Sequence, residues 1–291
     1  MPRMWQSHEK RRRLRDLSSM RVESVRLNKF EEELPVKVTL LNPDQVKNIF
    51  NVWGEFAATC YNTPSEYAEK VGNTCFEDGH FSGSRTEYIK FKIEGIDRGI
   101  AEQAMRHEIG VRYEQGEHTY DENPAGIVKN LKSFRYVDMD NFEYTIPRSI
   151  AGNNEALDWY VGIMGDIDAA RSEIKKILIR DGIPKKQAVE DANYILPRAT
   201  NTSLVIAFTI EAFIHFQHKR QCVRAQHFNQ QLARLMKNEV VSIVPKLESK
   251  LVPQCEYLLW CPEGNRSCGR FLTRGKLLEK LSFLPLCGEK V

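Results

Sequence analysis

Residues 87–110 read EYIKFKIEGIDRGIAEQAMRHEIG, and the spacing of the apolar residues changes within this stretch. Between Ile89 and Ile93 the apolar residues alternate with charged ones, which is the period of a half-buried strand. After Gly95 the apolar spacing changes to that of a helix, which we expect over residues 97–110. The stretch therefore predicts a strand that passes directly into a helix.

Helices are expected on both sides of this stretch. Upstream, residues 42–45 (Asn-Pro-Asp-Gln) and 63–66 (Thr-Pro-Ser-Glu) are helix starts, because proline is tolerated in a first turn that follows a capping residue. Downstream, a helix is expected from residue 153 or 154 to about residue 181, and a shorter one should end before Pro197.

Three further segments complete the outline. Residues 111–132 lack a period and contain Gly116 and Pro124, so we expect a long inserted loop there. Residues 204–216 are apolar on nearly all sides, which predicts a helix buried in a core or a subunit interface. Residues 221–250 are amphipathic and predict another helix.

The composition is that of a globular protein without a membrane segment. Of its 291 residues 42% are hydrophobic, which is enough for a sizeable core. No run reaches the roughly eighteen apolar residues of a membrane-spanning helix. The N-terminus is charged where a secretory signal has its apolar stretch, so we expect a cytoplasmic protein.

Basic residues concentrate near the start of the chain, although the net charge is only +3. A charge of this size does not indicate a nucleic-acid partner by itself. We interpret the basic stretch as a solvated arm, with contact to a polyanion as the alternative.

The seven cysteines do not form a disulfide pattern, because they are odd in number and not closely paired. Reduced thiols fit this better. The spacing of Cys255, Cys261 and Cys268 differs from the short knuckles of zinc sites. We therefore expect no metal site, and structural zinc is the less favoured interpretation.

Gln103, Arg106 and His107 are spaced by three and four residues, so they share one face of the helix predicted over residues 97–110. Three polar groups on one face can converge on a ligand. The alternative is a solvated helix face, which is common on protein surfaces.

Arg220 and Arg224 are spaced by four residues. Two like charges at this spacing repel one another on a helix, and an anion between them offsets the repulsion. Phosphate is the natural anion, because the fixed fork of arginine donors matches its oxygens. The alternative is pairing with acidic residues of a neighbouring helix. The chain has no glycine-rich phosphate loop and no serine elbow, which disfavours folds with those signatures.

These residues belong to an ordered series of motifs that resembles the flavin-dependent thymidylate synthases. The passage from Ile93 to Arg98, with Gln103 and Arg106-His107, is similar to the approach to that family's arginine-histidine-arginine signature. The further matching motifs are Gly79-His80 with Ser82, Ser84 and Glu87; Ser133-Phe134-Arg135-Tyr136; Leu196-Pro197; Phe213, His215 and Phe216; Arg220 with Cys222, Arg224, Ala225 and Gln226; and the tail from Cys261 to Arg270. The specificity lies in the order of several weak motifs.

The resemblance implies an α+β fold with a central, mostly antiparallel sheet flanked by helices, as in thymidylate synthase-complementing proteins. It also implies a homotetramer with active sites between subunits. The implied cofactors are FAD, NADPH and 5,10-methylenetetrahydrofolate, and the implied reaction is C5 methylation of dUMP to dTMP. The resemblance covers residues 35–275, which leaves residues 1–34 as a basic extension and residues 276–291 as a tail.

The resemblance also implies roles for individual residues. Arg220 falls where the family has the arginine that activates the pyrimidine, since a fixed positive charge stabilises negative charge developing on the ring. The implied cofactor-binding residues are Ser84, Glu87, Arg106, His107, Glu108, Thr209, His215 and Arg224. The implied substrate-binding residues are Gln103, Arg106, Ser133, Arg135, Asn193 and Arg220, of which Ser133 and Arg135 come from another subunit.

Five positions differ in residue type from the family. Glu108 and Glu211 replace arginines, and Thr209 replaces an asparagine. Leu131 stands where the family has an acidic residue shortly before the serine, and Asn193 stands where a phosphate-contacting arginine is usual. A carboxylate repels a nearby diphosphate unless the geometry has changed, but it accepts a hydrogen bond from a ribose hydroxyl.

Three functional hypotheses follow. The first is flavin-dependent methylation of dUMP, which the order of the motifs favours. The second is a divergent enzyme that methylates or hydroxymethylates another pyrimidine nucleotide, such as UMP in a nucleoside-antibiotic or modified-nucleotide pathway. The third is a non-catalytic nucleotide-binding protein, supported by the basic extension and the altered flavin positions.

Overall fold

The computed structural model describes residues 36–106, 109–114 and 117–282, in two compact units. Residues 36–94, 102–130 and 204–282 form the first, here called the sheet unit. Residues 95–101 and 131–203 form the second, here called the helical unit. The predicted basic extension, His107 and Glu108 lie outside the described residues.

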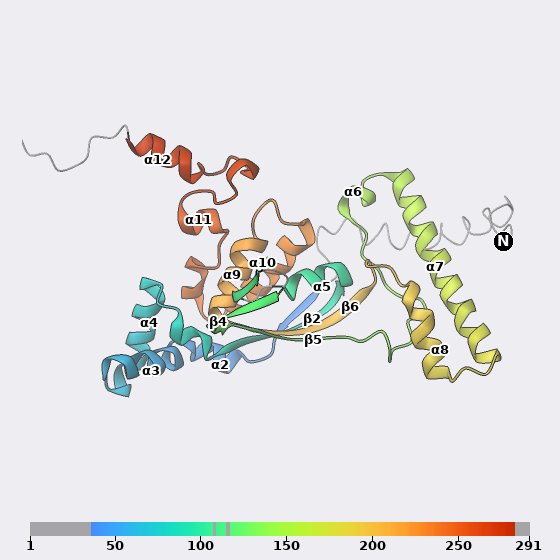
Figure 1. Cartoon of the computed structure of the whole chain (residues 1–291), viewed down its shortest axis with the longest axis horizontal. Helices are drawn as coiled ribbons and strands as arrows, with labels where there is room; N and C mark the ends of the chain where they lie inside the picture. The colour runs from blue at the N-terminus through green and yellow to red at the C-terminus, as the bar shows by residue number, and fades with distance from the viewer. Residues whose placement is uncertain (1–35, 107–108, 115–116, 283–291) are drawn as a thin grey trace, which may run out of the picture. The chain divides into compact units, whose positions relative to one another are not determined.

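A four-stranded sheet organises the sheet unit (Figure 1). The strands in spatial order are β1 (Lys37–Leu40), β2 (Tyr88–Asp97), β6 (Asn201–Thr209) and β5 (Ile127–Leu131). Antiparallel pairing of β1 and β2 places Lys37 opposite Glu94 and Leu40 opposite Phe91. The sheet with its flanking helices confirms the α+β class.

β2 has the alternation that predicted it. Ile89, Phe91 and Ile93 are fully buried, and the lysines between them are exposed. Phe91 packs against Phe213 with ring centroids 5.3 Å apart. This contact joins the sheet to α9 (Ile210–Arg220), which with α10 (His227–Val241) lies against the sheet in Figure 1.

α3 (Ile49–Tyr61) and α4 (Ala68–Asp78) cross at very close range in the sheet unit. Gly54 and Gly72 face one another at this crossing, and a Cβ added at Gly72 would lie 1.9 Å from the carbonyl oxygen of Phe50. No side chain fits in that space. The helices therefore require glycine at their contact.

α7 (Asn154–Arg180) is the long helix of the helical unit, and α8 (Lys185–Ala192) packs against it (Figure 1). Asn153 caps α7 through Oδ1, which accepts from the amide of Ala156 at 3.0 Å. This start and the end at Arg180 agree with the sequence expectation. Met139, Phe142 and Met164 form a buried cluster in the same unit.

The remaining elements are short. The sheet unit contains α2 (Pro43–Lys47), α11 (Gln254–Leu258), α12 (Arg274–Ser282) and the 3₁₀ turns Ser65–Tyr67, Ser82–Arg85, Pro245–Ser249 and Gly264–Arg266. The helical unit contains α6 (Arg148–Ala151) and the 3₁₀ turn Asn193–Ile195. In the described part of the chain, no helix combines the length and apolar character that crossing a membrane requires.

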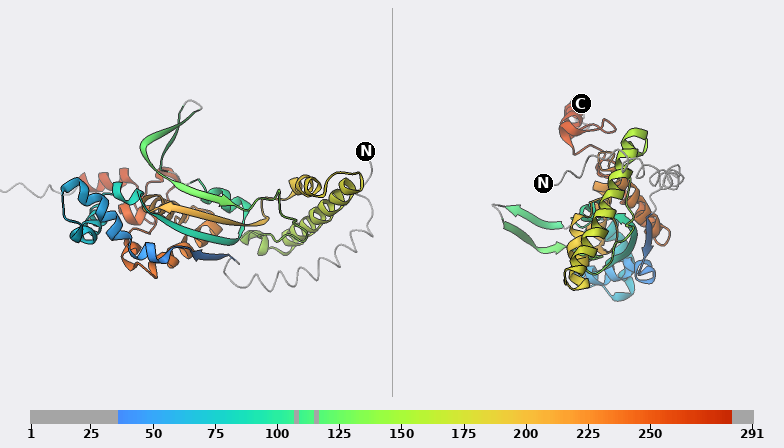
Figure 2. Two further views of the ribbon diagram at one scale, coloured as in Figure 1. Left: turned by 90° about the horizontal axis from the view of Figure 1, so that it is seen from below. Right: turned by 90° about the vertical axis from the view of Figure 1, so that its right-hand side faces the viewer.

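The helix expected over residues 97–110 was too long, and the loop expected over residues 111–132 was wrong, because most of that segment forms strands. The helix is α5 (Arg98–Ala104), and the chain then forms β3 (Ile109–Glu114), β4 (Glu117–Ala125) and β5. β3 and β4 pair antiparallel and stand off the sheet as a hairpin (Figure 2). The local spacing of apolar residues does not reveal such strands, because their stability comes from cross-strand pairing.

The helices expected over residues 204–216 and 221–250 also differ from the structure. The first segment divides between β6 and α9, because an apolar run of this kind has the same pattern in a buried strand and a buried helix. The second begins with turns, so that α10 starts only at His227.

The crossing of α3 and α4 predicts the effect of one methyl group. Gly72→Ala places a Cβ against backbone oxygen, and we expect a loss of about 3 kcal/mol in the free energy of unfolding, measured with denaturant. Gly162→Ala in α7 is the matched control, because no atom lies within 4 Å of its added Cβ. We expect that variant to gain about 0.5–1 kcal/mol. Equal stability of Gly72→Ala and the parent protein would contradict the close crossing.

Candidate functional site

Arg220 ends α9, and its guanidinium contacts Gln103 in the last turn of α5. Nη2 donates to the backbone oxygen of Gln103 at 3.1 Å, and Nη1 donates to its side-chain Oε1 at 3.4 Å. The two residues are 117 positions apart in sequence. Burial lowers the pKa of Arg220, but a guanidinium stays charged at any working pH. A fixed, partly desolvated positive charge therefore lies beside α5.

Two residues at the start of α10 extend this contact into a network. Nδ2 of Asn229 donates to Oε1 of Gln103 at 2.8 Å, and Nε2 of Gln103 donates to Oε1 of Gln226 at 2.9 Å. Gln103 thus bonds to residues of α9, α10 and the turn between them. We refer to Gln103, Arg220, Gln226 and Asn229 as the amide network.

Asn229 belongs to none of the sequence motifs and was not predicted as a site residue. It could have been found from its position on α10, because it lies on the same buried face as Leu232, Ala233, Met236 and Val240. A buried asparagine in an apolar stripe needs a partner. That partner is Gln103.

The residues predicted to share a helix face do not lie on one helix. α5 ends at Ala104, so Arg106 follows the helix, and its backbone amide donates to the backbone oxygen of Gln103 at 3.4 Å. Arg224 lies in the turn after α9, and its Nη2 donates to the backbone oxygen of Ser267 at 3.3 Å. Arg220 and Arg224 therefore do not form a helical pair.

Several expected cofactor residues have side chains that hold the local fold. Ser84 is fully buried, and its Oγ donates to the backbone oxygen of Phe81 at 2.6 Å. Thr209 caps α9, with Oγ1 accepting from the amide of Ala212 at 3.3 Å. Glu87 and His215 are half-buried, and burial is the main cause that lowers the pKa of His215.

Arg85 forms an ion pair with Glu211 that the sequence analysis also missed. Nε of Arg85 donates to Oε2 of Glu211 at 2.6 Å, and the two side chains are only 30% and 20% exposed. The pair joins the 3₁₀ turn beside Ser84 to the first turn of α9. The negative charge at Glu211 is therefore neutralised locally.

In the helical unit, Asn193 fixes the segment from Phe134 to Val137. Its Nδ2 donates to the backbone oxygens of Phe134 at 2.6 Å and Val137 at 3.0 Å, while Oδ1 accepts from Arg171 at 3.1 Å. Asn193 is only 6% exposed. Its amide is thus committed to the protein and supports the segment that carries Ser133 and Arg135.

An ion cluster ties the same segment to α7. Arg171 is fully buried and pairs with Asp138 and Asp140, and Nζ of Lys175 contacts the same carboxylates at 2.8 and 2.6 Å. The hydrogen bond from Lys175, with a further one from Arg171, lowers the pKa of Asp140 to about 2. A buried guanidinium requires such partners.

Ser133 and Arg135 lie on the surface side of this segment. Ser133 Oγ accepts from the Arg135 amide at 3.3 Å. The Arg135 guanidinium is 62% exposed and binds both carboxylate oxygens of Glu190, at 2.6 and 3.3 Å. The three substrate residues expected in this unit are therefore brought together: Ser133, Arg135 and Asn193 all lie on or against one segment.

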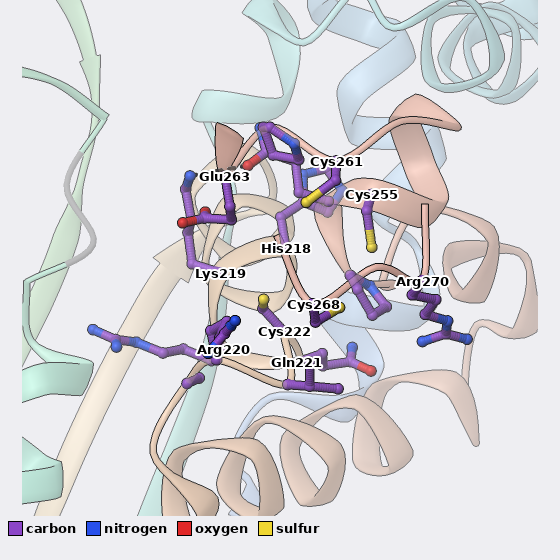
Figure 3. Close-up of a pocket in the computed structure, with 16 residues that line it drawn as sticks. His218, Lys219, Arg220, Gln221, Cys222, Cys255, Cys261, Glu263, Cys268 and Arg270 are labelled. Carbon is purple, nitrogen blue, oxygen red and sulfur yellow. Dashed lines mark hydrogen bonds between the residues drawn. The ribbon is translucent and has the colours of Figure 1, made fainter. Parts of the chain in front are cut away.

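A pocket of about 240 Å³ adjoins Arg220 in the sheet unit (Figure 3). Cys222, Cys255, Cys261 and Cys268 line it, and all four are free thiols. Burial, with smaller contributions from Cys222 and Cys261, raises the pKa of Cys255. Within residues 36–106, 109–114 and 117–282, no three histidine, cysteine or acidic side chains are arranged to hold a metal ion.

The fold and the amide network define an α+β protein with a cationic, amide-lined site. The sequence profile of the family described as "Thymidylate synthase complementing protein" matches residues 44–246.

Three known proteins similar to this chain carry the same name. The chain is 33% identical over 199 residues to the flavin-dependent thymidylate synthase of Nitratidesulfovibrio vulgaris, covering 68% of this chain and 74% of the relative. It is 28% identical over 253 residues to the protein of that name from Clostridium tetani, covering 81% and 94%. For the Pyrococcus furiosus protein the identity is 27% over 222 residues, covering 74% and 82%. The chain therefore belongs to the flavin-dependent thymidylate synthases, a family of enzymes, which confirms the resemblance read from the motifs.

His218, at the wall of the pocket, predicts a dependence of stability on pH. The residue is 8% exposed, a ring nitrogen contacts the backbone oxygen of Lys250 at 3.1 Å, and burial lowers its pKa from 6.5 to about 4. The unfolded chain therefore binds the proton more strongly between these values, so stability is full above pH 6.5 and falls as the pH drops towards 4.

We expect protonation of His218 to lower the free energy of unfolding by up to about 3 kcal/mol as the pH falls from 6.5 towards 4. His218→Asn removes the titrating group, so the difference in unfolding free energy between parent and variant should shrink as the pH falls from 7 to 4. Denaturant unfolding at a series of pH values measures it. Parallel curves for the two proteins would exclude His218 as the cause.

Proposed function

We propose that the protein methylates C5 of dUMP to give dTMP, using flavin, NADPH and 5,10-methylenetetrahydrofolate. The observation that carries the proposal is the fixed charge of Arg220 held against Gln103 at 3.1 Å. Membership of the family supports the class of reaction, because the similar proteins are named flavin-dependent thymidylate synthases.

Arg220 performs the activating step in this proposal. Its guanidinium donates hydrogen bonds to the pyrimidine ring and stabilises the negative charge that develops there as C5 attacks the one-carbon group of the folate. Gln103 orients the guanidinium through its backbone and side-chain oxygens. When bound, reduced flavin supplies the hydride that completes the methyl group.

The residues of the sheet unit fit an anionic flavin dinucleotide. Arg106 and Arg224 are exposed cations. Glu211 does not oppose a diphosphate with a net charge, because Arg85 neutralises it at 2.6 Å. In this proposal, the expected cofactor residues Ser84 and Thr209 contribute to flavin binding by fixing the local backbone through their side-chain hydrogen bonds.

Ser133 and Arg135 bind the phosphate of a nucleotide held by another subunit in our proposal, which places the active sites between the subunits of a homotetramer. The support is local: Arg135 is exposed, and its segment is fixed by Asn193 and the buried Arg171. Binding to phosphate requires Arg135 to leave Glu190, an exchange that an exposed ion pair permits at small cost.

A second candidate is the same chemistry on UMP or another pyrimidine nucleotide. Glu211 favours it, because a partly buried carboxylate accepts a hydrogen bond from a ribose hydroxyl. Membership of an enzyme family argues against a purely nucleotide-binding role.

The substrate panel tests the function. The protein is incubated with dUMP, UMP or dCMP, each with methylenetetrahydrofolate, NADPH and FAD, and product masses are measured. We expect a methyl group on dUMP; a product from UMP alone would select the second candidate. Arg220→Ala should reduce turnover about a hundred- to a thousandfold, as expected for loss of a charge that stabilises the reacting ring.

Arg234→Ala is the matched control, because Arg234 is an exposed arginine of α10. We expect that variant to keep the parent's turnover. Full activity of Arg220→Ala would remove Arg220 from the mechanism.

The ion pair of Arg85 and Glu211 makes a separate prediction about flavin binding. Arg85→Ala removes a cation and leaves Glu211 unpaired, so we expect the dissociation constant for FAD to rise about tenfold or more. The double variant Arg85→Ala with Glu211→Gln removes both charges and should recover most of that loss. Fluorescence titration with FAD measures both. Unchanged FAD affinity in Arg85→Ala would place the cofactor elsewhere.

A further inference from the structure

The amide network has a fixed hydrogen-bond direction. A guanidinium only donates, so the side-chain oxygen of Gln103, and not its nitrogen, must face Arg220. The same oxygen also accepts from Nδ2 of Asn229 at 2.8 Å. Both acceptor positions of this oxygen are therefore occupied. The Gln103 nitrogen gives one of its two hydrogens to Oε1 of Gln226 at 2.9 Å, so its second hydrogen is the part of the amide that remains for a ligand.

Asn229 maintains this direction at a cost to stability. The residue is fully buried, and its Oδ1 has no hydrogen-bond partner among the residues that the structure describes. A buried acceptor without a partner lowers stability, because it loses the hydrogen bonds that water gives it in the unfolded chain. Leucine would match the other apolar residues of the α10 stripe, such as Leu232 and Met236. A feature that lowers stability calls for a role beyond packing.

We propose that Asn229 is a positioning residue that makes the site select uracil over cytosine. This proposal rests on the proposed function. By occupying the Gln103 oxygen, Asn229 leaves a site whose ring-facing groups, the Gln103 amide nitrogen and the Arg220 guanidinium, are all donors. Uracil has carbonyl oxygens at C2 and C4, and both accept. Cytosine has an amino group at C4, which donates. This group would face another donor in the site, and that mismatch excludes cytosine.

The role of Asn229 is tested by the ratio of two affinities. The dissociation constants of dUMP and dCMP are measured by calorimetry for the flavin-loaded parent, Asn229→Leu and Asn229→Asp. Leucine removes the donor, and aspartate keeps the shape of asparagine without donating. We expect the parent to prefer dUMP, and both variants to bind dUMP about tenfold more weakly with little change for dCMP. The melting temperature of Asn229→Leu should equal or exceed that of the parent.

Gln217→Leu is the matched control, because Gln217 is a fully buried amide of α9 whose Nε2 bonds to the backbone oxygen of Ala233. That variant should melt at a lower temperature and keep the parent's preference for dUMP. If the parent prefers dUMP and both Asn229 variants keep the same ratio of dUMP to dCMP dissociation constants, the proposed role of Asn229 is wrong. The proposed function is not affected by that result. A parent that binds neither nucleotide contradicts the proposed function itself.

Discussion

The guanidinium of Arg220 against the oxygens of Gln103 is the contact on which the site depends. A strand, β2, leads into α5 and presents Gln103, while the adjacent strand β6 leads into α9 and ends at Arg220. Because the two strands are neighbours in one sheet, the elements that follow them bring together residues 117 positions apart. The aromatic packing of Phe91 on Phe213 joins β2 to α9.

The altered residue types of this chain have local compensations in the structure. Glu211 reverses the charge expected at its position, and Arg85 neutralises it. Asn193 replaces an expected arginine, yet Arg171 from α7 supplies a guanidinium directly behind it at 3.1 Å. At Glu211 and Asn193 the altered residue is therefore part of a set of contacts that includes an arginine from elsewhere in the chain.

The sequence allowed β2 and the cap and length of α7 to be predicted, since each has a strong local signal. The motifs also contain Gln103 and Arg220, which the structure brings into contact. The β3–β4 hairpin was not predictable, because its strands are specified by pairing. The division of residues 204–216 between β6 and α9 was ambiguous, because buried strands and buried helices share an apolar pattern. Asn229 and Arg85 were missed, since their roles come from partners distant in sequence.

A crystal structure of the protein with dUMP and FAD is the decisive measurement, because it locates the pyrimidine relative to the amide network. We expect the uracil ring within hydrogen-bond distance of the Arg220 guanidinium, with Oε1 of Gln103 still bonded to Asn229. A nucleotide bound away from Arg220, with the guanidinium still bonded to Gln103, would contradict the role of Arg220.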